Sequence, residues 1–106
     1  MLDMSTVHVT AVSGTVTIRE RIAIPPGSVA TVKLVDGDGE VLSATALDVE
    51  GVPAAFTLLV DPELVTKPSE LTLWAALRTE AGLWGTTDLV PVGSDGTDVV
   101  LTRIEA

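Results

Sequence analysis

Strict alternation of apolar side chains with other side chains is the feature that most constrains how this chain folds. It is clearest at 71–78, where every second residue, from Leu71 to Leu77, is apolar. Successive side chains of a strand point to opposite faces, so this pattern predicts a strand with one buried face. No stretch of the chain shows a persuasive 3.6-residue apolar period, the pattern typical of an amphipathic helix. The sequence therefore predicts an all-β fold.

Further β-prone runs are separated by glycine, proline and aspartate. They cover 6–24 with an interruption at Ser13-Gly14, then 29–35, 41–48, 54–60, 83–92 and 99–104. The apolar phase changes across Gly14, which predicts a bulge or a bend there. Asp61 followed by Pro62 predicts the start of one short helical turn. Strands at this spacing are typical of a sandwich or a small barrel, and we expect an immunoglobulin-like β-sandwich of about seven mostly antiparallel strands.

The composition fits a core built from aliphatic side chains. Hydrophobic residues make up 46% of the chain, yet Phe56, Trp74 and Trp84 are its only aromatic residues. Valine and isoleucine favour strands, in agreement with the alternation. A length of 106 residues indicates a single domain over 1–106. The residues that we expect in the core are Leu34, Phe56, Leu58, Leu73, Ala75, Leu77 and Leu101.

The charge of the chain limits the classes of partner that it is expected to bind. Fifteen acidic residues against six basic ones give a net charge of −9. Such an acidic protein repels phosphate backbones and anionic membrane surfaces, so we expect no nucleic-acid partner. No apolar run approaches the roughly 20 residues of a transmembrane helix. The absence of cysteine excludes disulfides, thiolate catalysis and a lipid-bearing cysteine within this sequence.

The acidic run around Asp36, Asp38 and Glu40 has two interpretations. Counted from Asp36, these residues occupy positions 1, 3 and 5 of an EF-hand calcium loop. Position 6, where the loop needs glycine, is then Val41, and position 12, where it needs an acid, is Leu47. We therefore interpret the run as a tight turn between strands, with weak calcium binding as the alternative.

The sequence holds no recognisable catalytic or cofactor-binding motif. His8 is the only histidine, and its neighbours in sequence form no metal-ligand pattern. No nucleophile elbow and no glycine-rich phosphate loop with lysine are present. We expect no catalytic residues, no metal site and no cofactor, and hence a protein that is not an enzyme.

Two tryptophans suggest a contact surface. If Thr79 faces Leu83 across the turn between them, Arg78 faces Trp84, and both tryptophans lie on the outer face of the sheet. One interpretation is a shielded outer face in which Arg78 covers Trp84 through a cation–π contact. The other is a platform of Trp74, Arg78 and Trp84 that contacts a protein chain or a sugar.

Short motifs occur in a fixed order along most of the chain. They are Gly14-Thr15-Val16, the run at 21–26, Leu34-Val35-Asp36, Gly51-Val52-Pro53 with Phe56, Asp61-Pro62, Leu73-x-Ala75-x-Leu77, Gly82-Leu83 and Thr87-Asp88. Over roughly 12–104 their order and spacing resemble the YbaY/YscW lipoprotein family. The resemblance implies a compact β-sandwich of the bacterial cell envelope, typically lipid-anchored. In the YscW branch it implies a pilot for an outer-membrane secretin, and it carries over no catalytic residues.

These observations predict a non-enzymatic YbaY-like structural or protein-interaction module whose protein partner is unknown. The alternative is a carbohydrate-binding module that uses Trp74 and Trp84 to hold a glycan. An exposed strand edge offers a further means of docking, or of self-association. The expected location is the cell envelope if the sequence is a trimmed lipoprotein domain, and the cytoplasm if Met1 is the native start.

Overall fold

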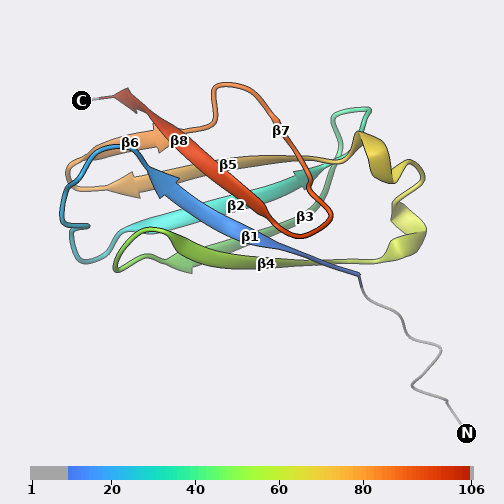
Figure 1. Cartoon of the computed structure of the whole chain (residues 1–106), viewed down its shortest axis with the longest axis horizontal. Helices are drawn as coiled ribbons and strands as arrows, with labels where there is room; N and C mark the ends of the chain where they lie inside the picture. The colour runs from blue at the N-terminus through green and yellow to red at the C-terminus, as the bar shows by residue number, and fades with distance from the viewer. Residues whose placement is uncertain (1–9, 106) are drawn as a thin grey trace, which may run out of the picture.

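The computed structural model describes residues 10–105, which form one strongly curved sheet of eight strands (Figure 1). Two short 3-10 turns, η2 (Pro62–Leu64) and η3 (Pro68–Glu70), connect β4 to β5. The strands are β1 (Thr10–Ile18), β2 (Val29–Val35), β3 (Val41–Asp48), β4 (Ala54–Val60), β5 (Thr72–Thr79), β6 (Gly82–Gly85), β7 (Val90–Pro91) and β8 (Thr97–Glu105).

The sequence located most of these strands. β2, β3 and β4 have the predicted bounds, and β5 is shifted by one residue. The predicted run at 83–92 is instead two strands, β6 and β7, separated by residues 86–89. The run at 19–24 is not a strand, and the predicted strand residues 6–9, including His8, lie outside the described residues.

The all-β prediction is confirmed, but the immunoglobulin-like sandwich is not. The strand order is β3-β2-β5-β6-β8-β1-β4, and β7 pairs with β5 outside this order. The sheet curls into a nearly closed barrel. β1 joins the two halves because it pairs with β4 on one side and with β8 on the other. The β1–β8 ladder is parallel, and Figure 1 shows the two strands running side by side in the same direction. A sandwich would have kept these halves as two separate sheets.

Gly14 allows β1 and β8 to approach each other closely. A Cβ atom at this position would lie 1.9 Å from the Thr97 carbonyl oxygen and 3.0 Å from the Phe56 ring. The predicted bulge at Gly14 is wrong, because β1 continues through Gly14 in unbroken register with β4. The alternative, a bend at Gly14, stays a prediction. Glycine is needed there because two backbones meet on the inner face of the sheet.

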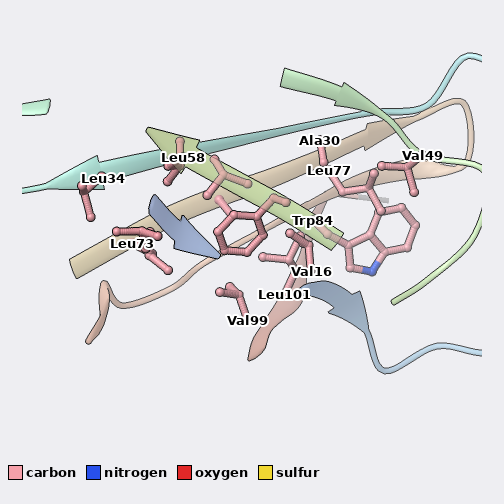
Figure 2. Close-up of a cluster of buried hydrophobic side chains, with 14 of the residues drawn as sticks. Val16, Ala30, Leu34, Val49, Leu58, Leu73, Leu77, Trp84, Val99 and Leu101 are labelled. Atoms are coloured by element: carbon pink, nitrogen blue, oxygen red, sulfur yellow. The ribbon is translucent and has the colours of Figure 1, made fainter. Parts of the chain in front are cut away.

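The interior is filled by aliphatic side chains from both halves of the sheet. Figure 2 shows Leu34 and Leu73 at one end of this core and Trp84 beside Val49 at the other. All seven residues expected in the core are buried, with exposed fractions between 0% and 4%. The predicted helical turn is also confirmed, because the Asp61 carboxylate accepts a hydrogen bond from the Glu63 amide at the start of η2.

Candidate interaction surface

The β5–β6 hairpin has a different register from the predicted one, and this moves Trp84 into the core. Thr79 pairs with Gly82 rather than with Leu83, so Leu77 faces Trp84. A shift of one residue turns every side chain of a strand to the opposite face. Trp84 is 0% exposed, and its predicted place on the outer face is wrong.

Trp84 has a different cationic neighbour from the one predicted. The guanidinium carbon of Arg103, on β8, lies 5.2 Å from the indole centroid, and Arg103 also donates to the Ala81 carbonyl oxygen at 2.8 Å. The buried indole Nε1 makes no hydrogen bond in the described part of the chain. Trp84 therefore closes one end of the core instead of offering a surface to a ligand.

Trp74 and Arg78 do lie on the outer face of the sheet. Trp74 is half-buried and pairs across the strands with Lys33, whose Nζ lies 4.9 Å from the ring centroid. Arg78 is exposed beside Val29 of β2 and Leu83 of β6. A platform of two tryptophans is therefore absent, and the contact role of Trp74 and Arg78 stays a prediction.

The acidic run after β2 forms the expected turn. One oxygen of the Asp36 carboxylate accepts from the amides of Asp38 and Glu40, each at 2.9 Å. The Asp36 amide donates to the Glu40 carbonyl oxygen, and Gly39 has a φ of +84°. Among the described residues no group of three or more acidic or histidine side chains is arranged to hold a metal ion. The carboxylate of Asp36 thus organises its own loop.

A hollow lies between the segment before β2 and the β3–β4 connection. Its volume is about 520 Å³. The Ser28 hydroxyl in its wall donates to the Pro25 carbonyl oxygen at 2.7 Å, so this serine is not paired with a base. The hollow does not assemble a catalytic group with its activating partner. Its lining residues are Ile24, Pro25, Pro26, Gly27, Ser28, Asp48, Val49 and Glu50.

The barrel is left open between β3 and β4. These strands stand at the two ends of the strand order, and no ladder joins them. They nevertheless lie close together, and Figure 1 shows β4 passing in front of β3 along the lower edge of the view. The Ser43 hydroxyl donates to the Leu59 carbonyl oxygen at 2.6 Å across this gap. We call the facing edges of β3 and β4 the open seam.

Backbone groups of β4 are directed into the open seam. The N–H and C=O groups of one strand residue point to the same side, and successive residues alternate between sides. Because the Leu59 carbonyl is directed at β3, the N–H and C=O groups of Thr57 and Ala55 also point away from β1. No ladder partner is present for them among residues 10–105. These groups are the kind that an additional strand can bind.

The side chains of the open seam do not protect it against pairing. Natural edge strands are usually blunted by charged residues or proline. Apart from Asp48, the last residue of β3, neither strand carries a charged side chain. Leu59 is 62% exposed and Val41 is 49% exposed, so each strand also presents apolar surface.

The sequence predicted docking at an exposed strand edge but did not identify β3 and β4 as the strands that form it. Both strands had the correct bounds, and their lack of charge was visible in the sequence. Which strands end the sheet, however, follows from the pairing of β1 with β8. That pairing brings together residues from the two ends of the chain, and local patterns do not record it.

The fold of this chain is similar to that of a solved structure. An alternative pilotin from the type II secretion system of Vibrio cholerae has a similar structure, with a TM-score of 0.71 and 25% sequence identity. The match covers 93% of this chain and 98% of the pilotin. The similarity extends over nearly the whole of both chains, so this chain and the pilotin share one architecture.

The family itself is shown by sequence. Residues 7–102 match the family described as type III secretion system lipoprotein chaperone (YscW), and the chain belongs to this family. It is also 35% identical over 102 residues to the uncharacterized lipoprotein YbaY of Escherichia coli strain K12. That alignment covers 88% of this chain and 54% of YbaY, so the chain spans about half the length of this relative. These matches confirm the resemblance to the YbaY/YscW family.

The comparisons give no support to the carbohydrate alternative. The family is described as a chaperone and the structural neighbour as a pilotin. Within residues 10–105 no helix has the length and apolar character that crossing a membrane requires.

Proposed function

We propose that this domain is a non-enzymatic protein-interaction module that binds an extended segment of another protein along the open seam. The observation that carries the proposal is the open seam itself, where two strands with no charged side chain except Asp48 face each other without a ladder. Addition of a strand to a sheet edge is a common mode of peptide recognition, in which backbone hydrogen bonds supply affinity.

The cost of opening the seam is small. The Ser43–Leu59 hydrogen bond is exposed, and a bond of this kind contributes about 0.5–1.5 kcal/mol to stability. A partner strand that adds two or three backbone hydrogen bonds to β4 offsets this loss. The adjacent apolar surface of Leu59 and Val41 adds to the favourable contact.

The comparisons support a proposal for the setting of such binding. The family is described as a lipoprotein chaperone of a secretion system, and the structural neighbour is a pilotin. We therefore place the activity of this domain in the bacterial cell envelope, with a protein of the secretion or envelope machinery as the partner. Trp74 and Arg78 on the outer face are a second candidate contact for the same partner.

Photo-crosslinking in the native cell tests this function. Benzoylphenylalanine is placed at Thr57, in the open seam, and in a control variant at Val100, which is 44% exposed on β8 in the middle of the sheet. We expect a discrete adduct from position 57 and none from position 100, with the crosslinked peptide belonging to a protein of the cell envelope.

Three results would contradict the proposal. One is the absence of an adduct from position 57, and another is the same set of adducts from both positions. The third is an adduct formed only between two copies of this chain, which would make the seam a self-association surface.

A further inference from the structure

The distribution of charge around the open seam defines the segment that fits it. We propose that the seam accepts an extended peptide segment that is uncharged in its centre and carries lysine or arginine at both ends. This inference rests on the proposed function, because it names the chemistry of the partner at the same site.

The first end of the seam is acidic on both strands. Glu40 immediately precedes β3, in the turn that also holds Asp36 and Asp38. Asp61 immediately follows β4, and Glu63 lies in η2. β3 begins where β4 ends, because the Ser43–Leu59 bond joins the start of one strand to the end of the other. A basic side chain that leaves the seam here meets carboxylates from both sides.

The second end is acidic as well. Asp48 ends β3, and Glu50 lies in the connection from β3 to β4. Both residues are exposed, and both line the hollow described above. No lysine or arginine occurs between Lys33 and Lys67, the stretch that contains both strands of the seam and the connection between them. Neither strand of the seam therefore supplies a basic side chain that would neutralise these acids.

The centre of the seam sets the length and polarity of the segment. The backbone groups directed away from β1 belong to Ala55, Thr57 and Leu59. An antiparallel strand rises about 3.4 Å per residue, so these positions match an uncharged stretch of about five or six residues. A charge within that stretch would lie along β3 and β4, which carry no charged side chain before Asp48.

The same charges disfavour a second copy of this chain as the occupant. A symmetric dimer through the seam would bring the acidic ends of one copy toward those of the other, and each chain has a net charge of −9. Like charges placed together across an interface oppose association. A partner with basic ends removes this repulsion.

Synthetic peptides test the inference on the intact chain. The probe is Lys-Lys-Thr-Val-Thr-Val-Thr-Val-Lys-Lys, with a glutamate-ended peptide of the same centre as its counterpart. A scrambled peptide with the lysines in the centre controls for attraction between net charges. We expect the lysine-ended peptide to bind with amide NMR shifts concentrated in β3 and β4. The glutamate-ended peptide should bind at least about tenfold more weakly at low salt.

Matched variants locate the effect on the protein. The double variant Glu50→Lys with Glu63→Lys removes one acid from each end, and neither side chain has a role in the turns described above. We expect it to bind the lysine-ended peptide about three- to tenfold more weakly. The control double variant, Glu80→Lys with Asp88→Lys, makes the same change in net charge at exposed positions outside β3, β4 and their connection. Its affinity should remain within about twofold of the parent.

The outcomes separate this inference from the proposed function. Equal binding of lysine-ended and glutamate-ended peptides at the seam would overturn the inference and leave the seam as a docking site. Equal binding of the scrambled peptide, or shifts outside β3 and β4, would also overturn it, because attraction between net charges would then explain the affinity. Failure of the proposed function is measured separately, by the loss of the crosslink from position 57.

Discussion

The two junctions of the curled sheet differ in how they are closed. At one junction β1 and β8 form a parallel ladder of five residue pairs, from Gly14–Thr97 to Ile18–Leu101. At the other junction β3 and β4 have no ladder, and the Ser43 hydroxyl reaches the Leu59 carbonyl. The closed junction has a glycine where the backbones meet, which permits close approach. From this difference we infer that the closed junction stabilises the fold, and we propose the open one as the binding site.

The largest loss of stability should come from a substitution at the closed junction. Phe56 is 4% exposed and its ring lies against Gly14. Replacing it by alanine leaves a cavity in the core, and we expect Phe56→Ala to lower the free energy of unfolding by about 3–5 kcal/mol. Denaturant unfolding of Leu59→Ala is the control, since Leu59 is exposed in the same strand. Equal midpoints for the two variants would contradict the assignment of the inner and outer faces of β4.

Gly14→Ala tests the close approach itself. The added methyl group would lie 1.9 Å from the Thr97 carbonyl oxygen, so β1 and β8 must separate. We expect a loss of about 1–3 kcal/mol, measured by the same unfolding experiment. Gly51→Ala provides the comparison, because a Cβ at Gly51 meets nothing within 4 Å. An unchanged stability of Gly14→Ala would show that the junction tolerates a wider spacing.

A substitution at the open junction should lower stability only slightly. Ser43→Ala removes the Ser43–Leu59 hydrogen bond, and we expect a loss of about 0.5–1.5 kcal/mol. Binding of the lysine-ended peptide should not weaken, because the seam then opens more easily. A loss above about 3 kcal/mol, seen in the denaturation midpoint, would mean that the two strands are more tightly joined than this bond implies.

The smallest effect concerns the outer face. Lys33→Met removes the charge above Trp74 and keeps most of the aliphatic stem, so we expect a loss of about 0.5–1 kcal/mol. Peptide affinity should be unchanged, because this pair lies on β2 and β5 rather than on the seam. If Trp74→Ala abolishes the crosslink from position 57 while the protein remains folded, the outer face takes part in binding, as predicted for Trp74 and Arg78.

Local alternation was sufficient to predict strands and core but not register. The bounds of β2, β3 and β4 and the seven core residues follow from period-two patterns that each strand carries by itself. Whether Trp84 is buried or exposed depends on whether Thr79 pairs with Gly82 or with Leu83. Both registers place an apolar residue opposite an apolar residue somewhere in the hairpin. Packing of the indole against Val49, from a distant connection, favours the observed register.

The candidate site was harder to predict than the strands, because its position depends on how all the strands of the sheet pair. The absence of charge in β3 and β4 and the acids at their ends were visible in the sequence. An uncharged strand can equally be central, where both edges are paired. Only the pairing of β1 with both β4 and β8 makes β3 and β4 the ends of the strand order.

Amide hydrogen exchange along β4, followed by NMR, tests the central claim most directly. The account predicts alternation within one strand: the amides of Thr57 and Leu59 exchange fast, while those of Phe56 and Leu58, directed at β1, are protected. Addition of the lysine-ended peptide should slow exchange at Thr57 and Leu59. Equal protection of all four amides in the free protein would show that the seam is already closed, and would contradict the account.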